Sequence, residues 1–173
     1  ALLLDLKEGD EVIMPSFTFV STANAFLLRR ATPVFVDIRS DTLNINENII
    51  QSAITDKTKA IVVVHYAGVS CEMEKINDIA KRHNIALIED AAQAPGTFYK
   101  GKPIGTIGDI GGFSLNYHKH IHTGEGGIAV TNDDNLAEKM RLIRNHAEAV
   151  VEAKGEKNLV NMLGHNFRLG EIE

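Results

Sequence analysis

Short runs rich in β-branched residues alternate with segments of helical periodicity along the first half of this chain. The runs typical of strands are residues 11–14, 33–37, 60–65 and 85–89. The third of these runs is almost continuously apolar, as expected for a strand buried on both faces. Between the runs, apolar side chains recur at helical spacing over residues 21–29, 46–55 and 73–83. Because crossovers of roughly 20 residues can return a chain to a parallel neighbour, the alternation predicts an α/β fold. Its mostly parallel sheet would carry helices on both faces, in three layers.

The pattern changes after Asp90, where glycine and proline become frequent between residues 96 and 112. Residues 112–115 and 127–131 are predicted to form two strands around a loop rich in histidine and glycine. Residues 135–146 predict a charged helix with three apolar residues on its buried face, Leu136, Met140 and Ile143. The sequence has no repeat, low-complexity tract or linker, so the chain is one domain or part of one.

Composition argues against several classes of partner. The chain has 18 Lys and Arg residues against 23 Asp and Glu, a net charge of −5, whereas a protein that binds nucleic-acid phosphates shows a basic excess. Its longest apolar stretches are far shorter than the about 18 residues that a membrane-spanning helix needs. A single cysteine, Cys71, excludes an internal disulfide framework and fits a reducing cytoplasm. We therefore expect a cytoplasmic protein that binds neither nucleic acid nor membrane.

The two ends of the chain do not resemble natural termini. Ala1 is neither an initiator methionine nor the start of a basic signal sequence. Residues 168–173 resemble the first turn of a helix that is then cut off. We expect the chain to be a piece of a longer protein.

Unusual polar side chains follow the predicted strands at the point where each ends. They are Ser16, Thr18, Asp37, His65, Tyr66, Glu89, Asp90 and Ser114. A single polar residue at a strand end is most often a cap or turn residue. Because open parallel sheets bind ligands beyond the carboxyl ends of their strands, five coinciding ends indicate a binding site there.

Four segments carry a resemblance to a known family: residues 15–22 (PSFTFVST), 89–93 (EDAAQ), 114–119 (SLNYHK) and 123–127 (TGEGG). Together and in this order they resemble the fold-type I aminotransferases that use pyridoxal phosphate. More closely, they resemble the nucleotide-sugar aminotransferases of the DegT/DnrJ/EryC1/StrS family, over the whole chain. Residues 9–24 are most similar to the group that makes dTDP-4-amino-4,6-dideoxygalactose.

The resemblance implies a role for five residues. Lys119 matches the lysine that forms the Schiff base with the cofactor, and Asp90 matches the carboxylate that pairs with the pyridine nitrogen. Gln93 matches a glutamine near the phenolic oxygen of the ring, and Ser114 matches a hydroxyl that reaches the phosphate. Phe19 stands where the family places an aromatic ring on the pyridine, although a core phenylalanine would look the same.

The loop that carries Lys119 departs from the commonest family pattern. Many members read His-Pro-Thr-Lys-Asn where residues 116–120 read NYHKH. His118, His120 and His122 alternate, so in an extended segment they would share one face and resemble a zinc site. No cysteine or carboxylate follows with ligand spacing, so we expect no metal. These histidines are instead expected to recognise substrate phosphates or to tune the proton transfers of the lysine.

The segment 164–169 resembles the family's Gly-Tyr-Asn-Tyr-Arg stretch. The resemblance implies that Asn166 contacts the cofactor phosphate of a neighbouring subunit, and therefore that the protein is a homodimer. It also makes Arg168 a candidate partner for an anionic group of the substrate. A capping asparagine and an exposed arginine explain the same residues equally well.

The resemblance implies transfer of an amino group from an amino acid, which we expect to be L-glutamate, to a keto group of a nucleotide-linked deoxysugar, in cell-surface polysaccharide biosynthesis. Residues 1–173 would be the central part of the cofactor-binding large domain, without the N-terminal phosphate loop and the C-terminal small domain. This piece alone is expected to hold the cofactor weakly and to be inactive.

Two alternatives stay open: a sugar dehydratase, which has histidine in place of Lys119, and a non-catalytic, cofactor-binding regulatory relative. A dinucleotide-binding domain is disfavoured because no Gly-x-Gly-x-x-Gly follows the first strand.

Overall fold

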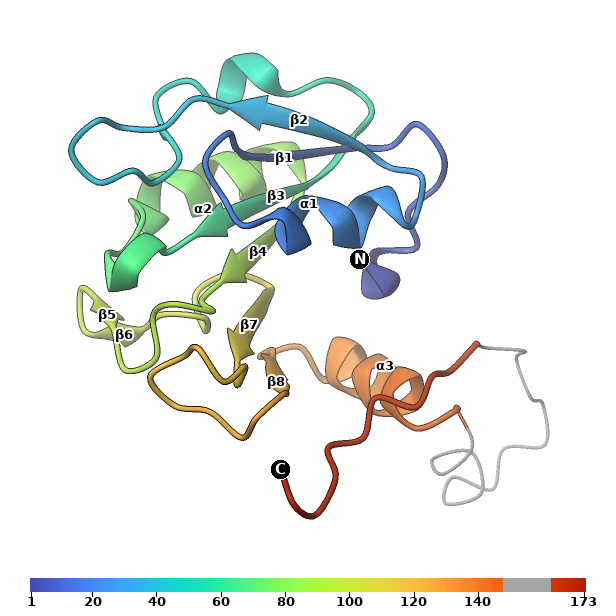
Figure 1. Cartoon of the computed structure of the whole chain (residues 1–173). Helices are drawn as coiled ribbons and strands as arrows, with labels where there is room; N and C mark the ends of the chain where they lie inside the picture. The colour runs from blue at the N-terminus through green and yellow to red at the C-terminus, as the bar shows by residue number, and fades with distance from the viewer. Residues whose placement is uncertain (148–162) are drawn as a thin grey trace.

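A six-stranded sheet forms the frame of the computed structural model, which describes residues 1–147 and 163–173 (Figure 1). The strand order is β2-β1-β3-β4-β7-β8. The strands are β1 Glu11–Pro15, β2 Thr32–Val36, β3 Thr58–Val64, β4 Ala86–Asp90, β7 Ile110–Ser114 and β8 Gly127–Val130. All neighbouring pairs are parallel except β7 and β8, which are antiparallel. The predicted, mostly parallel sheet is confirmed.

The other elements connect the strands. The helices are α1 Val20–Leu27, α2 Met73–His83 and α3 Asp134–Arg144. Three short 3-10 turns are η1 Leu2–Leu4, η2 Gln51–Ala53 and η3 Tyr66–Gly68, and a small hairpin consists of β5 Phe98–Tyr99 and β6 Lys102–Pro103. Helix α2 has the bounds that the sequence predicts. It ends where Asn84 adopts a left-handed conformation, after three basic residues that complement the negative end of the helix dipole.

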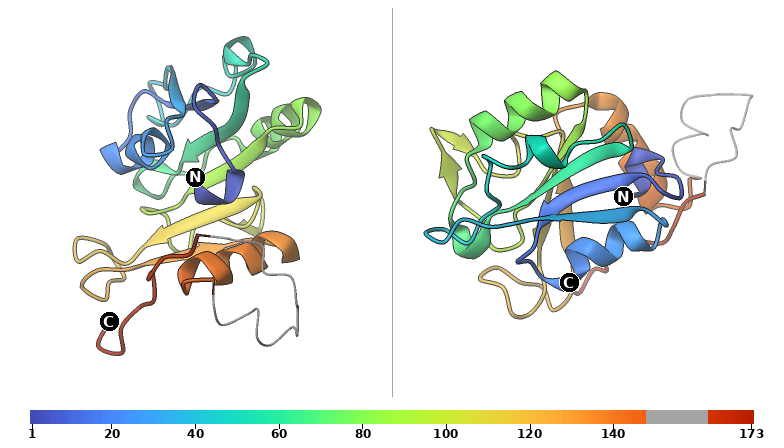
Figure 2. Two further views of the ribbon diagram at one scale, coloured as in Figure 1. Left: turned by 90° about the vertical axis from the view of Figure 1, so that its right-hand side faces the viewer. Right: turned by 90° about the horizontal axis from the view of Figure 1, so that it is seen from above.

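Helices cover both faces of the sheet, as the sequence predicts. Figure 2 shows α1 and α2 on opposite sides of the strands. Ile76 of α2 packs in one cluster with Ile61 of β3, whereas Phe26 of α1 packs in the other with Val62. Because successive side chains of a strand point to opposite faces, this double cover explains the continuous apolar run of β3.

Two expectations about helices are wrong. Residues 46–55 form turns and the short η2 rather than a helix. The side chain of Asn46 accepts a hydrogen bond from the backbone N–H of Asn48 at 3.0 Å, an alternative to helical bonding that asparagine often adopts. The segment's one fully buried apolar residue, Ile50, and the partly buried Ala53 and Ile54 pack in the core without forming a helix. Residues 168–173 also form no helix turn.

Among the described residues, every helix is too short or too polar to cross a bilayer.

Candidate active site

Asp90, the last residue of β4, is held by two donors. Thr22 of α1 donates its hydroxyl proton to Asp90 Oδ2 at 2.8 Å, and the backbone N–H of Ala92 donates to Oδ1 at 3.1 Å. The hydroxyl of Thr18 donates in turn to the hydroxyl oxygen of Thr22 at 2.9 Å. Thr22 itself is buried. The resulting Thr18–Thr22–Asp90 chain orients a half-buried carboxylate at the carboxyl end of the sheet.

Gln93 lies three residues further along the chain and is fixed by one contact. The backbone N–H of Ala67 donates to Gln93 Oε1 at 2.8 Å. Because a backbone N–H can only donate, this contact identifies the amide oxygen of Gln93. The amide NH₂ group is therefore the part of this side chain that remains to donate to a ligand oxygen.

Strand β7 lies beside β4 and ends at Ser114. Asp90 pairs in register with Gly112, where an added Cβ would meet no atom within 4 Å. A strand glycine of this kind leaves room for a flat ligand to approach the backbone. Two residues on, the half-buried Ser114 accepts a hydrogen bond from the backbone N–H of Asn116 at 3.2 Å. Its hydroxyl proton remains available to an anion.

Lys119 lies in the loop between β7 and β8. The amide nitrogen of Asn116 donates to both carboxylate oxygens of Glu125, at 2.8 and 3.0 Å, and so closes the loop on itself. The backbone N–H of Lys119 donates to the carbonyl of Asn116 at 2.9 Å. Lys119 is half-buried, and its ammonium group has no ion pair or hydrogen bond to any residue within 1–147 or 163–173. It is therefore an amine without a competing protein partner in that part of the chain.

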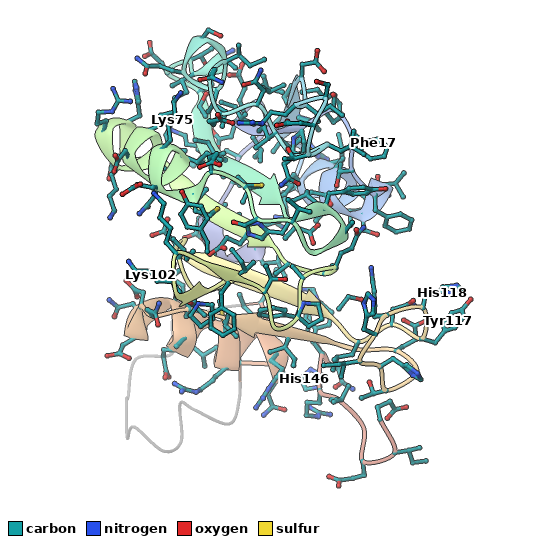
Figure 3. All side chains as sticks on the ribbon, turned by 90° about the vertical axis from the view of Figure 1, so that its left-hand side faces the viewer. Phe17, Lys75, Lys102, Tyr117, His118 and His146 are labelled. Atoms are coloured by element: carbon teal, nitrogen blue, oxygen red, sulfur yellow. The ribbon has the colours of Figure 1, made fainter. Side chains whose placement is uncertain are left out.

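The loop that carries His118, His120 and His122 forms turns and bends, not the extended segment in which these histidines would share one face. The Asn116–Glu125 contact folds the loop back on itself. The ring of His118 instead lies against Tyr117, with centroids 3.8 Å apart and planes tilted by 37°. Figure 3 shows this pair on the same side of the molecule as Phe17. Within the described residues, no three His, Cys, Asp or Glu side chains gather as a metal site would require.

Aromatic rings flank the site. Phe19, the residue that caps the start of α1, leaves 71% of its surface exposed. Phe17 packs edge-on against Tyr66, with ring centroids 5.0 Å apart and planes at 60°. The exposed ring of Phe19 has the freedom to stack on a ligand, and its predicted role stays a prediction.

Within the described residues, Asn166 and Arg168 make contacts with Asn145 and no hydrogen bond to Asp90, Gln93, Ser114 or Lys119, and Leu169 lies near Gly126 of the Lys119 loop. Residues 163–173 run beside α3 (Figure 1), where Asn166 forms an antiparallel bridge with Asn145. Arg168 Nη1 donates to the side-chain oxygen of Asn145 at 2.5 Å. Asn166 is exposed, so its proposed contact with a neighbouring subunit also stays a prediction.

Several residues of this region escaped sequence reasoning. Thr22 stands inside the quoted segment 15–22, four residues after Thr18, and this helical spacing was the available signal. The Asn116–Glu125 contact had no local signal, because it joins the two sides of a loop. Glu89 is a polar strand end and the first residue of the segment EDAAQ, but neither feature predicts that its side chain is fully buried beside His65.

A mostly parallel sheet with helices on both faces is the fold of the fold-type I pyridoxal-phosphate-dependent transferases. The model of the DegT/DnrJ/EryC1/StrS aminotransferase family matches residues 1–173. The chain belongs to this family.

Curated relatives and solved structures agree with the family. The uncharacterised protein MJ1066 of Methanocaldococcus jannaschii is 51% identical over 143 residues, which cover 83% of this chain and 37% of that protein. GDP-perosamine synthase of Caulobacter vibrioides is 43% identical over 170 residues, which cover 98% of this chain and 45% of the synthase. The chain therefore spans less than half the length of either relative.

An aminotransferase from Psychrobacter cryohalolentis superposes with a TM-score of 0.91 and 39% identity, over 98% of this chain and 45% of that one. NtdA from Bacillus subtilis, solved with the cofactor PMP bound, superposes with a TM-score of 0.82 and 36% identity. That match covers 95% of this chain and 37% of NtdA.

Proposed function

We propose that the protein containing this chain is a pyridoxal-phosphate-dependent aminotransferase. It transfers an amino group from an amino acid, L-glutamate by our prediction, to a keto group of a nucleotide-linked deoxysugar. The observation that carries the proposal is the oriented Asp90 carboxylate beside the bare backbone of Gly112, at the edge that also carries Ser114. Family membership and the similarity to a GDP-perosamine synthase support the reaction class.

The residues present fit the cofactor. Asp90 would pair with the protonated pyridine nitrogen, and the Thr22 hydroxyl that donates to Asp90 stabilises the negative charge needed for that pairing. The amide NH₂ of Gln93 would donate near the phenolic oxygen, and the Ser114 hydroxyl would reach the phosphate. Phe19 would cover the ring. When bound, the cofactor supplies an electron sink for the bond that breaks at the α-carbon of the donor.

Lys119 has two tasks in this mechanism. Its amine holds the cofactor at rest, and the half-buried position without a protein partner leaves that amine reactive. During the transfer, the same amine would accept the proton that leaves the α-carbon of the donor and would later give that proton back. In the second half-reaction the keto-sugar receives the nitrogen, and Lys119 moves the proton in the reverse direction.

The wider organisation is part of the proposal. Residues 1–173 form the central part of the large domain, and a phosphate loop and a small domain come from other parts of the polypeptide. Asn166 contacts the phosphate across a homodimer interface. The similarity to enzymes of dTDP-4-amino-4,6-dideoxygalactose synthesis and the cytoplasmic location stay predictions.

The test uses the natural polypeptide that carries these residues, incubated with pyridoxal phosphate. We expect a visible absorbance band that Lys119→Ala abolishes and that Lys102→Ala, which changes an exposed lysine of β6, leaves intact. A band that survives Lys119→Ala would refute the lysine assignment. With L-glutamate and a nucleotide-linked keto-sugar, an aminotransferase forms one 2-oxoglutarate per aminated sugar. A sugar that has lost water but gained no amino group would instead identify the dehydratase.

A further inference from the structure

Glu89 is a carboxylate buried inside the sheet, one residue before Asp90, with no exposed surface. Its Oε1 accepts hydrogen bonds from the backbone N–H groups of Ile107 at 2.7 Å and Gly108 at 2.6 Å. Its Oε2 accepts from the backbone N–H of Gly105 at 2.8 Å and lies 2.9 Å from Nε2 of His65. A carboxylate offers about four lone-pair sites, so each one has a donor.

These donors keep Glu89 ionised. Burial alone raises the pKa of a carboxyl group, but here the hydrogen bonds from His65, Gly108 and Gly105 outweigh it and hold the pKa of Glu89 below its ordinary value. The core therefore contains a fixed negative charge beside the proposed active site.

His65 is fixed in one tautomer by its two contacts. Its Nδ1 accepts a hydrogen bond from the backbone N–H of Cys71 at 3.2 Å, so Nδ1 carries no proton. The proton of the neutral ring is then on Nε2, which donates to Glu89. The backbone N–H of His65 also donates to the carbonyl of Asp90 at 3.1 Å, so the end of β3 is tied to both Glu89 and Asp90.

Glycines allow the turn 105–108 to approach Glu89 so closely. A Cβ on Gly105 would lie 2.6 Å from the ring of Phe113, and one on Gly108 would lie 2.7 Å from the carbonyl oxygen of Leu87. A Cβ on Gly111 would clash with the carbonyl oxygen of Gly105. Because these positions have no side chain, three backbone N–H groups converge on one carboxylate, an arrangement typical of an anion nest.

We propose that Glu89 is the positioning residue of the cofactor site, an inference that rests on the proposed function. Its charge ties together the end of β3, strand β4 and the turn that leads into β7. Asp90 ends β4 and Ser114 ends β7, so this tie sets the distance between the partner of the cofactor ring and the partner of its phosphate. Glu89 touches neither the cofactor nor the substrate.

The test compares Glu89→Gln with the wild type in the natural polypeptide. Glutamine keeps the shape but turns an NH₂ group toward N–H donors, so the turn 105–108 should loosen. We expect the affinity for pyridoxal phosphate to fall about tenfold or more. The affinity for pyridoxal, which lacks the phosphate, should fall much less, because pyridoxal binding does not depend on the distance between Asp90 and Ser114. Hydrogen exchange of the Gly105, Ile107 and Gly108 amides should accelerate.

Two controls separate positioning from general destabilisation. Glu8→Gln makes the same charge change at an exposed site, and Ile76→Val weakens the core where α2 packs against the sheet. Both should leave the preference for pyridoxal phosphate over pyridoxal unchanged. The inference is overturned if Glu89→Gln keeps the wild-type preference for pyridoxal phosphate over pyridoxal. It is also overturned if Ile76→Val loses as much of that preference as Glu89→Gln does. If the wild type itself binds no pyridoxal phosphate, the proposed function fails, and the positioning role with it.

A second measurement needs no variant and decides the case if Glu89→Gln does not fold. In wild-type protein with ¹⁵N-labelled histidine, the neutral ring of His65 should carry its proton on Nε2. A proton on Nδ1, or a ring that exchanges freely between tautomers, would mean that Glu89 does not hold His65, and the inference would fall.

Discussion

The hydroxyl of Thr22 lies 2.8 Å from the carboxylate of Asp90, although 68 residues separate them in the chain. Thr22 is in the first turn of α1 and Asp90 ends β4, so the contact joins a helix to a strand end across the carboxyl edge of the sheet. Thr18 donates to Thr22 behind it and fixes the direction of the Thr22 proton. An oriented carboxylate therefore depends on the docking of a helix that immediately follows β1.

Thr22→Val should weaken cofactor binding. Valine fills the same volume but cannot donate, so Asp90 loses the hydrogen bond that stabilises its charge, worth about 1–1.5 kcal/mol or roughly a five- to tenfold loss of affinity. This loss of affinity is measured by titrating each variant with pyridoxal phosphate while protein fluorescence is monitored. Thr18→Val removes only the outer bond of the chain and should have a smaller effect. If the two variants lose affinity equally, the order Thr18–Thr22–Asp90 is wrong.

Asp90→Asn should separate cofactor binding from catalysis. Asparagine keeps the shape and can still accept from Thr22, but it carries no charge to hold a proton on the pyridine nitrogen. We expect the cofactor still to bind while turnover falls by about 100-fold or more, the range found when one preorganised charge partner is removed. Asp78→Asn, an exposed change on α2, is the matched control. Turnover within twofold of wild type in Asp90→Asn would contradict the assigned role.

The buried charge of Glu89 should make stability depend on pH in a defined direction. Its pKa in the folded protein lies below the ordinary value of 4.5, so its stabilisation is complete above about pH 4.5 and is lost as the pH falls through the folded value. Breaking this buried set of hydrogen bonds with Glu89→Gln should cost about 3 kcal/mol of unfolding free energy at pH 7. Urea unfolding at several pH values should show the gap between variant and wild type narrowing below pH 4. A constant gap at all pH values would show that Glu89 is not ionised.

The strand and helix pattern could be predicted because it depends on local periodicity. Helix α2 was predicted to the residue, since its buried face repeats at helical spacing and Asn84 ends it. The same periodicity was misleading at residues 46–55, where an asparagine turn satisfies the backbone in another way. Apolar spacing indicates which residues are buried, and here Ile50, Ala53 and Ile54 pack against the core from turns rather than from a helix.

The site was predicted only as far as local motifs reach. Asp90, Gln93 and Lys119 could be named because they stand in recognisable short segments. Their partners could not be named, because Thr22 lies 68 residues from Asp90 and Ala67 lies 26 residues from Gln93. The hydrogen-bond donors of Glu89 could not be predicted for the same reason, since they lie between 16 and 24 residues away in the chain. Only the folded sheet brings these groups into contact.

The contact between Asn116 and Glu125 should control the reactivity of Lys119. Asn116→Asp replaces a donor with a carboxylate facing another carboxylate at hydrogen-bond distance, so repulsion should open the loop. We expect cofactor capture by Lys119, measured as the fraction trapped by borohydride reduction, to fall about fivefold or more. The double variant Asn116→Asp/Glu125→Gln restores one donor and one acceptor with the roles exchanged, and should recover most of the capture. If the double variant is as poor as Asn116→Asp, the loop contact does not position Lys119, and the loss comes from the new charge alone.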